Sequence, residues 1–258
     1  MTSTAPVQPN VAVHPAKYVL RKLPLVTALF WALKIIAVTL GETASDQFAI
    51  ELKIGYATCA IVFFAFFVIV AFLQLRAKRF HPGLFWTVIF STSLVGTSIS
   101  DLMDRGAGHS GTVTNNGIGY GTGAIILTSI LVVIFLVWRR SGQTYDVEKI
   151  ATRKGEMLYW IAILVSNTLG TASGDWLAHS TGLGFRNAFF VIAATMLLLL
   201  AAHYLTNINS MVLFWVAFVL TRPLSAAAGD SITKPVSEGG LGLGTLWGSV
   251  ALLGCSPR

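Results

Sequence analysis

Acidic side chains at a repeated spacing are the groups in this chain best placed to do chemistry. Four times, an aromatic residue and a Trp are followed by an Asp that stands fifteen residues after the Trp. Charged residues make up only 11% of the sequence, so chance is a poor explanation for four carboxylates at one offset. The chain is therefore an internal repeat with four copies. The motifs of copies one to four are Phe30-Trp31 to Asp46, Phe85-Trp86 to Asp101, Tyr159-Trp160 to Asp175, and Phe214-Trp215 to Asp230.

These carboxylates predict a site for a hard cation. Glu42 stands four residues before Asp46 and shares its helix face, so copy one is the most acidic. Oxygen ligands without paired His or Cys residues favour manganese, magnesium, calcium or protons over zinc and copper. We predict a divalent cation as the ligand and no tightly bound cofactor. The predicted metal ligands are Glu42, Asp46, Asp101, Asp175 and Asp230.

Small hydroxylated residues on the same helix faces predict a path for the ion. Thr97 and Thr171 stand four residues before Asp101 and Asp175. Hydroxyl groups that face a bundle axis can help to dehydrate a cation, although small residues also serve ordinary helix packing. The predicted substrate or ion path consists of Lys34, Thr39, Thr97, Asn167, Thr171 and Arg222.

Two of these path residues are cations inside apolar runs. Lys34 lies in copy one, and Arg222 precedes Pro223 in copy four, where Asn167 fills the equivalent slot of copy three. A bare Lys or Arg in lipid is costly, so each should face water or an acidic partner. For Lys34 we expect that partner to be Glu42 or Asp101. A proton relay or gate and a static salt bridge both fit this pattern.

A purely structural interpretation of the Asp residues competes with the site. Arg105, His179 and Lys234 each stand four residues after their Asp, which is helical ion-pair spacing. Copy one has Ile50 at that position. We therefore expect the carboxylates of copy one to remain available to a ligand, and the Asp of copy four to be structural.

The elements that must position these residues are helices in a membrane. The chain is 54% hydrophobic with a mean hydropathy of +0.71, far from the composition of soluble domains. Each copy reads as two helices and a turn, which predicts an all-α membrane protein with eight transmembrane helices, or seven and a short last one near 243–254. The Trp pairs fit an aromatic belt at the membrane interface.

The repeat also has a second level. The number of residues from Trp31 to Trp160 equals the number from Trp86 to Trp215, which indicates two tandem halves. We call this constant separation in sequence the half-repeat. We divide the chain into a cytoplasmic tail (1–22), a first half of two helix pairs (23–140), a cytoplasmic linker (141–156) and a second half of two helix pairs (157–258).

Basic residues predict the orientation of these helices. Twelve Lys and Arg residues fall in the tail, in the connections after helices two and four, and at the C-terminus, against four on the opposite side. By the positive-inside rule both termini are cytoplasmic. The basic residues behind the net charge of +7 then face anionic lipid headgroups on the cytoplasmic side, and nucleic acid is not an expected partner.

Two motifs resemble a known bacterial family. They are Lys34 with Thr39-Leu40-Gly41-Glu42-Thr43-Ala44-Ser45-Asp46, and Arg222-Pro223 with Gly229-Asp230 and Lys234-Pro235. This pattern is similar to that of inner-membrane proteins described only as uncharacterised membrane or membrane-anchored proteins. The resemblance implies a bacterial inner (plasma) membrane location and little about activity.

The sequence favours transport over the other classes of function. Repeats with polar, broken helices and intramembrane ions are typical of secondary transporters, and no ATP-binding motif is present. We expect a secondary transporter or channel for a cation, with manganese as the example. The alternative is a non-transporting scaffold or sensor in which the Asp residues are caps and ion pairs. An enzyme is not expected, since no nucleophile motif is found. The oligomeric state stays open.

Overall fold

In the part of the chain that the computed structural model describes (residues 23–106, 116–236 and 240–244), all regular secondary structure is helical. Two π-helical turns, η1 (Gln47–Glu51) and η3 (Trp176–Ser180), extend the helices before them, and a short 3-10 helix, η2 (Val147–Lys149), lies in the central connection. The seven α-helices are α1 (Ala28–Asp46), α2 (Tyr56–Arg76), α3 (Pro82–Arg105), α4 (Tyr120–Arg140), α5 (Arg153–Asp175), α6 (Gly184–Leu205) and α7 (Ser210–Thr233).

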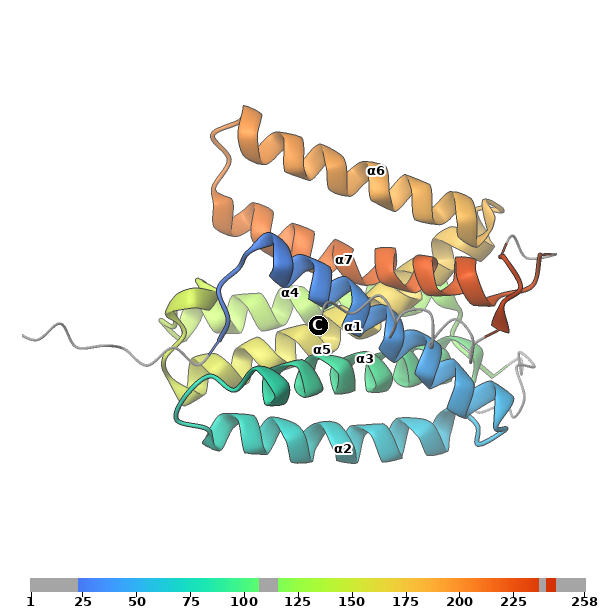
Figure 1. Cartoon of the computed structure of the whole chain (residues 1–258), viewed down its shortest axis with the longest axis horizontal. Helices are drawn as coiled ribbons and strands as arrows, with labels where there is room; N and C mark the ends of the chain where they lie inside the picture. The colour runs from blue at the N-terminus through green and yellow to red at the C-terminus, as the bar shows by residue number, and fades with distance from the viewer. Residues whose placement is uncertain (1–22, 107–115, 237–239, 245–258) are drawn as a thin grey trace, which may run out of the picture.

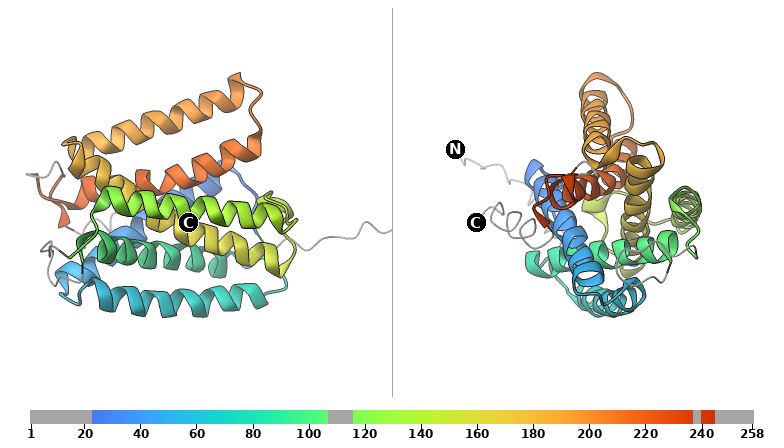
Figure 2. Two further views of the ribbon diagram at one scale, coloured as in Figure 1. Left: turned by 180° about the vertical axis from the view of Figure 1, so that it is seen from behind. Right: turned by 90° about the vertical axis from the view of Figure 1, so that its right-hand side faces the viewer.

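The four helices that carry the Trp and Asp motif form the centre of the bundle. They are α1, α3, α5 and α7, and all four run in the same direction, while α2, α4 and α6 return (Figure 1). Each motif helix packs on two others, so that α1, α3, α5 and α7 close a ring. Each returning helix packs mainly on the motif helix of the following copy: α2 on α3, α4 on α5 and α6 on α7. The end view in Figure 2 shows the returning helices outside this ring.

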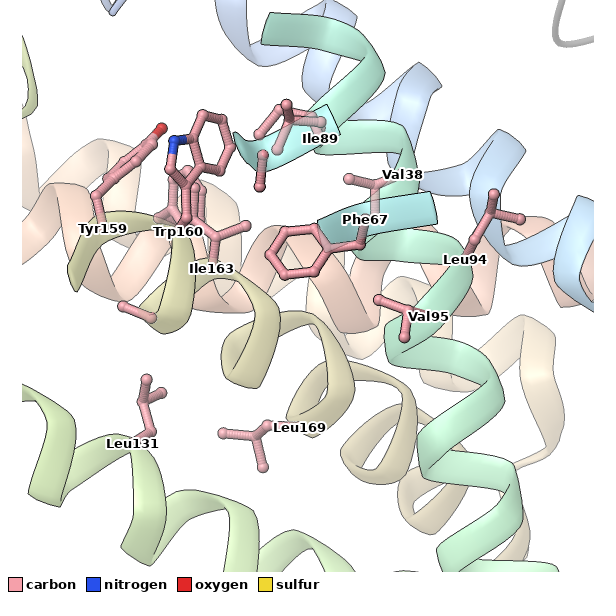
Figure 3. Packing of buried hydrophobic residues seen from close by; sticks show 14 of the residues in the cluster. Val38, Phe67, Ile89, Leu94, Val95, Leu131, Tyr159, Trp160, Ile163 and Leu169 are labelled. Carbon is pink, nitrogen blue, oxygen red and sulfur yellow. The ribbon is translucent and has the colours of Figure 1, made fainter. Parts of the chain in front are cut away.

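The sequence explains which helices form the centre. The motif helices are rich in Gly, Ser and Thr, and α3 alone buries Ser91, Thr92, Ser93, Gly96 and Thr97. Small residues let helix backbones approach closely when lipid supplies no hydrophobic driving force between helices. Apolar side chains fill the remaining space, as Figure 3 shows for Val38, Ile89, Val95 and Ile163 of the ring together with Phe67 and Leu131 of the returning helices.

The returning helices present an apolar surface that suits lipid. Ile61 of α2, Ile125 of α4 and Leu198 of α6 expose 70–72% of their surface. Six helices are long and apolar enough to cross a membrane, which makes the chain a multi-pass membrane protein. The remaining one, α5, falls short of this criterion. It begins with Arg153 and Lys154, and most of its polar residues are covered by protein.

The predicted eighth helix, near 243–254, falls almost entirely outside the described residues. The structure therefore describes seven helices where the sequence predicts eight or seven and a short one. Helix α5 begins at Arg153, inside the range assigned to the linker, because Thr152 caps it by accepting a hydrogen bond from the Gly155 amide.

The odd and even copies differ just after the Asp. In copies one and three the α-helix ends at the Asp and a π-helical turn follows at once, as η1 and η3. In copies two and four the α-helix continues for three or four residues, to Arg105 and Thr233. Single π-helical turns are frequent at functional sites. The copies therefore alternate in structure as well as in sequence.

Candidate functional site

The four repeated Asp residues lie at the same end of the bundle. Asp46 and Asp175 are the last residues of α1 and α5, and Asp101 and Asp230 lie in the last turns of α3 and α7. None exposes more than 4% of its surface. The constant offset from the Trp explains the common level, since fifteen residues of α-helix span about 22 Å.

Arg105 joins the Asp residues of copies two and three. Its Nε lies 3.3 Å from Asp101 one turn earlier in α3, and its Nη2 donates to Asp175 of α5 at 2.8 Å. The same guanidinium donates to the Tyr56 hydroxyl at 3.3 Å. The bridge therefore crosses from the first half of the chain to the second.

Lys234 joins the Asp residues of copies four and one in the corresponding way. Its Nζ lies 2.8 Å from Asp46 of α1 and 3.6 Å from Asp230 of its own copy. Lys234 directly follows the α7 span. Burial by itself lowers the pKa of Lys234, but Asp46 and Asp230 outweigh burial and hold the pKa well above its usual value. Lys234 is thus held as an ammonium between two copies.

The two bridges are related by the half-repeat. Arg105 and Lys234 are separated by the same step as Trp31 and Trp160, and so are Asp101 and Asp230. Each cation comes from an even copy and binds its own Asp and the Asp of the odd copy in the opposite half. The arrangement has pseudo-twofold symmetry, and both bridges connect the two halves.

A second layer of polar groups lies deeper in the ring, around Arg222. This side chain is fully buried and its Nη2 lies 2.5 Å from Glu42. The same nitrogen donates to Thr97 and, at 2.9 Å, to Thr171, while Thr97 donates to Glu42 at 2.7 Å. One group from each motif helix therefore meets at this point: Glu42 of α1, Thr97 of α3, Thr171 of α5 and Arg222 of α7.

The half-repeat also accounts for the space that Arg222 occupies. Ser93 is its equivalent in the first half, one half-repeat earlier in the chain. Ser93 donates to the carbonyl of Val38 at 2.7 Å, and Arg222 Nε donates to the carbonyl of Asn167 at 3.1 Å. The two contacts correspond, but the side chain at this position is neutral in the first half (Ser93) and charged in the second (Arg222). The central ion pair therefore breaks the symmetry.

Glycine makes the close approach possible in both halves. A Cβ at Gly170 would collide with the side chain of Arg222, and a Cβ at Gly41 would collide with Ser93. Pro223 follows Arg222 inside α7 and removes one backbone donor there. The sequence places these glycines on helix faces made of small residues, and the structure shows that they lie against Arg222 and Ser93.

The carboxylates of copy one, which we expect to remain available to a ligand, are paired with cations from another copy. Asp46 pairs with Lys234, and Glu42 pairs with Arg222. Ile50 cannot supply a cation within the copy, but neighbouring helices supply two. Asp230 contacts Lys234 of its own copy, at the longer of the two distances, and its structural role stays a prediction.

The expected partners of Lys34 and Asp175 also differ from those observed. Among the described residues Lys34 forms no ion pair. Its Nζ donates to the carbonyl of Phe218 at 2.7 Å and faces the Phe218 ring. His179 stacks on Tyr120 with ring centroids 5.4 Å apart, while Asp175 is bound by Arg105. A π-helical turn separates Asp175 from His179, so α-helical spacing does not apply between them.

The other predicted path residues are buried in the ring. Asn167 donates to Thr92 at 2.8 Å, which links α5 to α3. Thr39 Oγ1 and Asn167 Oδ1 are buried without a hydrogen-bond partner among the described residues. Such orphaned oxygens are uncommon in interiors and suit a water or an ion. The sequence therefore selects residues that the fold does bring inside.

The Trp residues form a packed layer between helices and not only an interfacial belt. Trp160 and Trp215 expose 2% and 8% of their surface. The Trp31 ring packs on Phe214 with centroids 5.6 Å apart, and Trp160 packs on Phe85 at 5.5 Å. These contacts join motif helices of different copies at the end opposite the Asp residues.

The described residues contain no group of three His, Cys, Asp or Glu side chains arranged to hold a metal ion. The carboxylates instead face Arg and Lys, so the metal role of Glu42 and the four Asp residues stays a prediction. A pocket of about 630 Å³ opens at this end of the bundle, and its lining includes Asp46, Arg105 and Lys234. The pocket therefore lies beside both bridges.

Sequence reasoning finds Arg105 and Lys234 only as partners within their own copies. Their separation, which equals the half-repeat, is the signal that could have indicated a shared role. Ser93 is missed as well, although it is the equivalent of Arg222. Asp104, which accepts from Ser100 at 3.2 Å, adds one more buried carboxylate near the Arg105 bridge.

Fold and site together define a multi-pass helical membrane protein built from four repeats, with an ion-pair network shared among all four. The chain belongs to the family described as Repeat of Unknown Function (DUF347), whose model matches residues 29–80, 84–144, 158–209 and 213–255. These four segments coincide with the four copies. Comparisons with curated proteins and with solved structures gave no match.

Proposed function

We propose that this protein is a secondary transporter or channel for a cation, with a divalent metal such as manganese as the leading substrate. The observation that carries the proposal is an excess of buried carboxyl groups over buried cationic groups. Five carboxylates, Glu42 and the four repeated Asp residues, meet three cations, and none of the five exposes more than 4% of its surface. The three cations are Arg105, Arg222 and Lys234.

The excess remains when the neighbouring buried groups are counted. Asp104 adds one carboxylate and Lys34 adds one cation, which leaves this network and its described neighbours two negative charges in excess. Unpaired charge is expensive in a protein interior within a membrane. One divalent cation or two protons would neutralise it, and carboxylate and hydroxyl oxygens are ligands that manganese, magnesium and calcium accept.

Irregular helix geometry beside the buried charges supports transport over a static role. Pro223 removes one backbone donor inside the continuous helix α7 next to Arg222, and the π-helical turns η1 and η3 follow Asp46 and Asp175 directly. Irregularities of this kind within helices are frequent at functional sites. The four copies are parallel repeats, and rigid-body rocking of such repeats against each other around a fixed site is the usual basis of alternating access.

Location and topology belong to the same proposal. The end opposite the Asp residues carries Arg76, Arg139, Arg140, Arg153 and Lys154, which the positive-inside rule assigns to the cytoplasm. We place the protein in a bacterial inner membrane with both termini cytoplasmic and the Asp residues toward the outside. The fourth family match extends to residue 255, which supports a second helix in copy four.

One observation favours the alternative of a scaffold or sensor. Each of the four Asp residues already contacts Arg105 or Lys234, at 2.8 to 3.6 Å. In a scaffold or sensor, the sole role of these paired carboxylates would be to fix the helices relative to one another. In that case the excess negative charge would be removed by protons and not by a transported ion.

Ion flux in reconstituted vesicles tests the proposal. The purified protein would be assayed for uptake of Mn²⁺, Mg²⁺ and Ca²⁺, and for proton flux, against vesicles without protein. Asp101→Asn should reduce the flux strongly, whereas Asp146→Asn, in the connection between α4 and α5, should not. Flux of these ions equal to that of empty vesicles would favour the scaffold.

A further inference from the structure

We propose that Lys34 is a proton-binding site whose proton is exchanged for the transported cation. The inference rests on the proposed transport function and names its coupling ion. Lys34 lies in α1, two turns before Glu42, and exposes 1% of its surface. It is a buried titratable group that the ion-pair network does not use.

The contacts of Lys34 differ from those of the cations in the network. Arg105, Arg222 and Lys234 each bind at least one carboxylate. Within the described residues Lys34 Nζ has one hydrogen bond, to the Phe218 carbonyl at 2.7 Å, and otherwise faces the aromatic rings of Phe218 and Trp31. An ammonium has three donors, so this environment satisfies one of them.

The charged groups on the packed helices do not compensate Lys34. On α7 the group that acts on it is Arg222, a cation, and Asp230 lies at the far end of that helix. On α3 the titratable residues, Asp101, Asp104 and Arg105, all lie in the last turns. On α1 the nearest carboxylate, Glu42, is bound to Arg222. Lys34 can therefore gain or lose its proton without breaking an ion pair.

A direct structural connection links Lys34 to the centre of the site. Its acceptor, Phe218, stands one helical turn before Arg222 in α7, and Pro223 directly follows Arg222. A cation that binds near Glu42 adds positive charge, which disfavours an ammonium at Lys34. In the exchange an N–H bond of the ammonium breaks, the electron pair stays on nitrogen, and the proton passes to water. The reverse step reloads the amine when the cation leaves.

The half-repeat supplies a substitution suited to the test. The residue equivalent to Lys34 in the second half is Ile163, one half-repeat later, which is fully buried in α5. Lys34→Ile therefore places in α1 a side chain that the same fold accommodates at the equivalent position. Lys34→Arg retains a cation that does not release its proton in proteins.

The experiment measures Mn²⁺ uptake into vesicles that contain the full chain, with and without an acidic interior. For the wild type, an inside-acid gradient should drive accumulation of Mn²⁺ about tenfold per pH unit and per proton exchanged. In Lys34→Ile and in Lys34→Arg, whatever Mn²⁺ uptake remains should be the same with and without the acidic interior. If Lys34→Ile does not fold, Lys34→Met serves in its place.

A second measurement follows protons directly. When Mn²⁺ is added to solubilised protein in weak buffer, the wild type should release more protons than Lys34→Ile. Gradient-driven uptake and proton release that are the same in the variants and the wild type would overturn the role of Lys34 while leaving transport intact. Absence of Mn²⁺ uptake and of Mn²⁺-induced proton release in the wild type would overturn the exchange together with manganese as the substrate.

Discussion

Lys234 lies 2.8 Å from Asp46, which is 188 residues away in the chain, and 3.6 Å from Asp230, which is one turn away in its own copy. The longer-range partner is thus the closer one. The contact joins α7 to α1 and thereby closes the ring of motif helices between its first and last members. Arg105 makes the equivalent connection between α3 and α5. The two cations together connect the halves of the protein.

We predict that Lys234→Gln destabilises the protein, because it leaves Asp46 and Asp230 without their shared cation. Removing one partner of a buried pair costs about 3–5 kcal/mol, and the partial exposure of Lys234 places the expected loss near the lower bound, at about 3 kcal/mol. Unfolding in mixed micelles measures the loss. Lys149→Gln is the matched control, since Lys149 also pairs with an Asp but on the exposed surface. It should produce no measurable change.

A double-mutant cycle separates the two partners of Lys234. The coupling energy between Lys234 and Asp46 should exceed that between Lys234 and Asp230, because the first pair is closer and crosses between helices. Lys234→Gln would be combined in turn with Asp46→Asn and Asp230→Asn. A larger coupling with Asp230 would contradict the bridge between the halves.

We predict that Glu42→Gln lowers stability, although its copy has no cation four residues after the Asp. Arg222 is fully buried, and in this variant it loses the one carboxylate that pairs with it among the described residues. The expected loss is about 3–5 kcal/mol. Glu42→Thr combined with Arg222→Ser should restore much of the lost stability. Thr171 is the equivalent of Glu42 in the second half, and Ser93 is the equivalent of Arg222 in the first half. An unchanged melting temperature for Glu42→Gln would indicate that the central pair contributes nothing.

We predict that Gly170→Ala destabilises the protein and that Gly174→Ala does not. A Cβ at Gly170 would collide with the near part of the Arg222 side chain and with Pro223, whereas a Cβ at Gly174 would meet its nearest neighbours at 3.7 Å, which is ordinary contact. Overpacking costs about 1–3 kcal/mol, while Ala at an unhindered helical position gains up to about 1 kcal/mol over Gly. Thermal unfolding of both variants measures the difference, and equal midpoints would argue against close packing at Arg222.

We predict that the contribution of Lys234 to stability is unchanged between pH 7 and about pH 10. Its pKa in the folded protein is held above the unfolded value of about 10.4, so this contribution is fully present below the unfolded pKa and is lost as the pH rises through the folded one. The difference in melting temperature between wild type and Lys234→Gln should therefore stay constant across this range. A decline by pH 9 would show that Asp46 and Asp230 do not raise the pKa of Lys234.

The sequence by itself determined the repeat, the helix pairs and the common level of the Asp residues. Each of these follows from spacing. An α-helix converts a constant fifteen-residue offset into a constant distance along its axis, and parallel copies must then place their Asp residues at one end. Low charge and long apolar runs likewise determined the membrane environment. Polar groups are costly in lipid, and the composition alone shows that these runs contain few of them.

Only the tertiary structure decided which charges pair. Arg105, His179 and Lys234 share one spacing from their Asp, yet two of them bridge to another copy and the third stacks on Tyr120. Lys34 likewise contacts a carbonyl of α7 and, among the described residues, no carboxylate. The physical reason is that an ion pair forms only where packed helices bring a charged nitrogen and a charged oxygen within about 4 Å of each other. That placement is set by helix packing at residues such as Gly170 and not by local spacing.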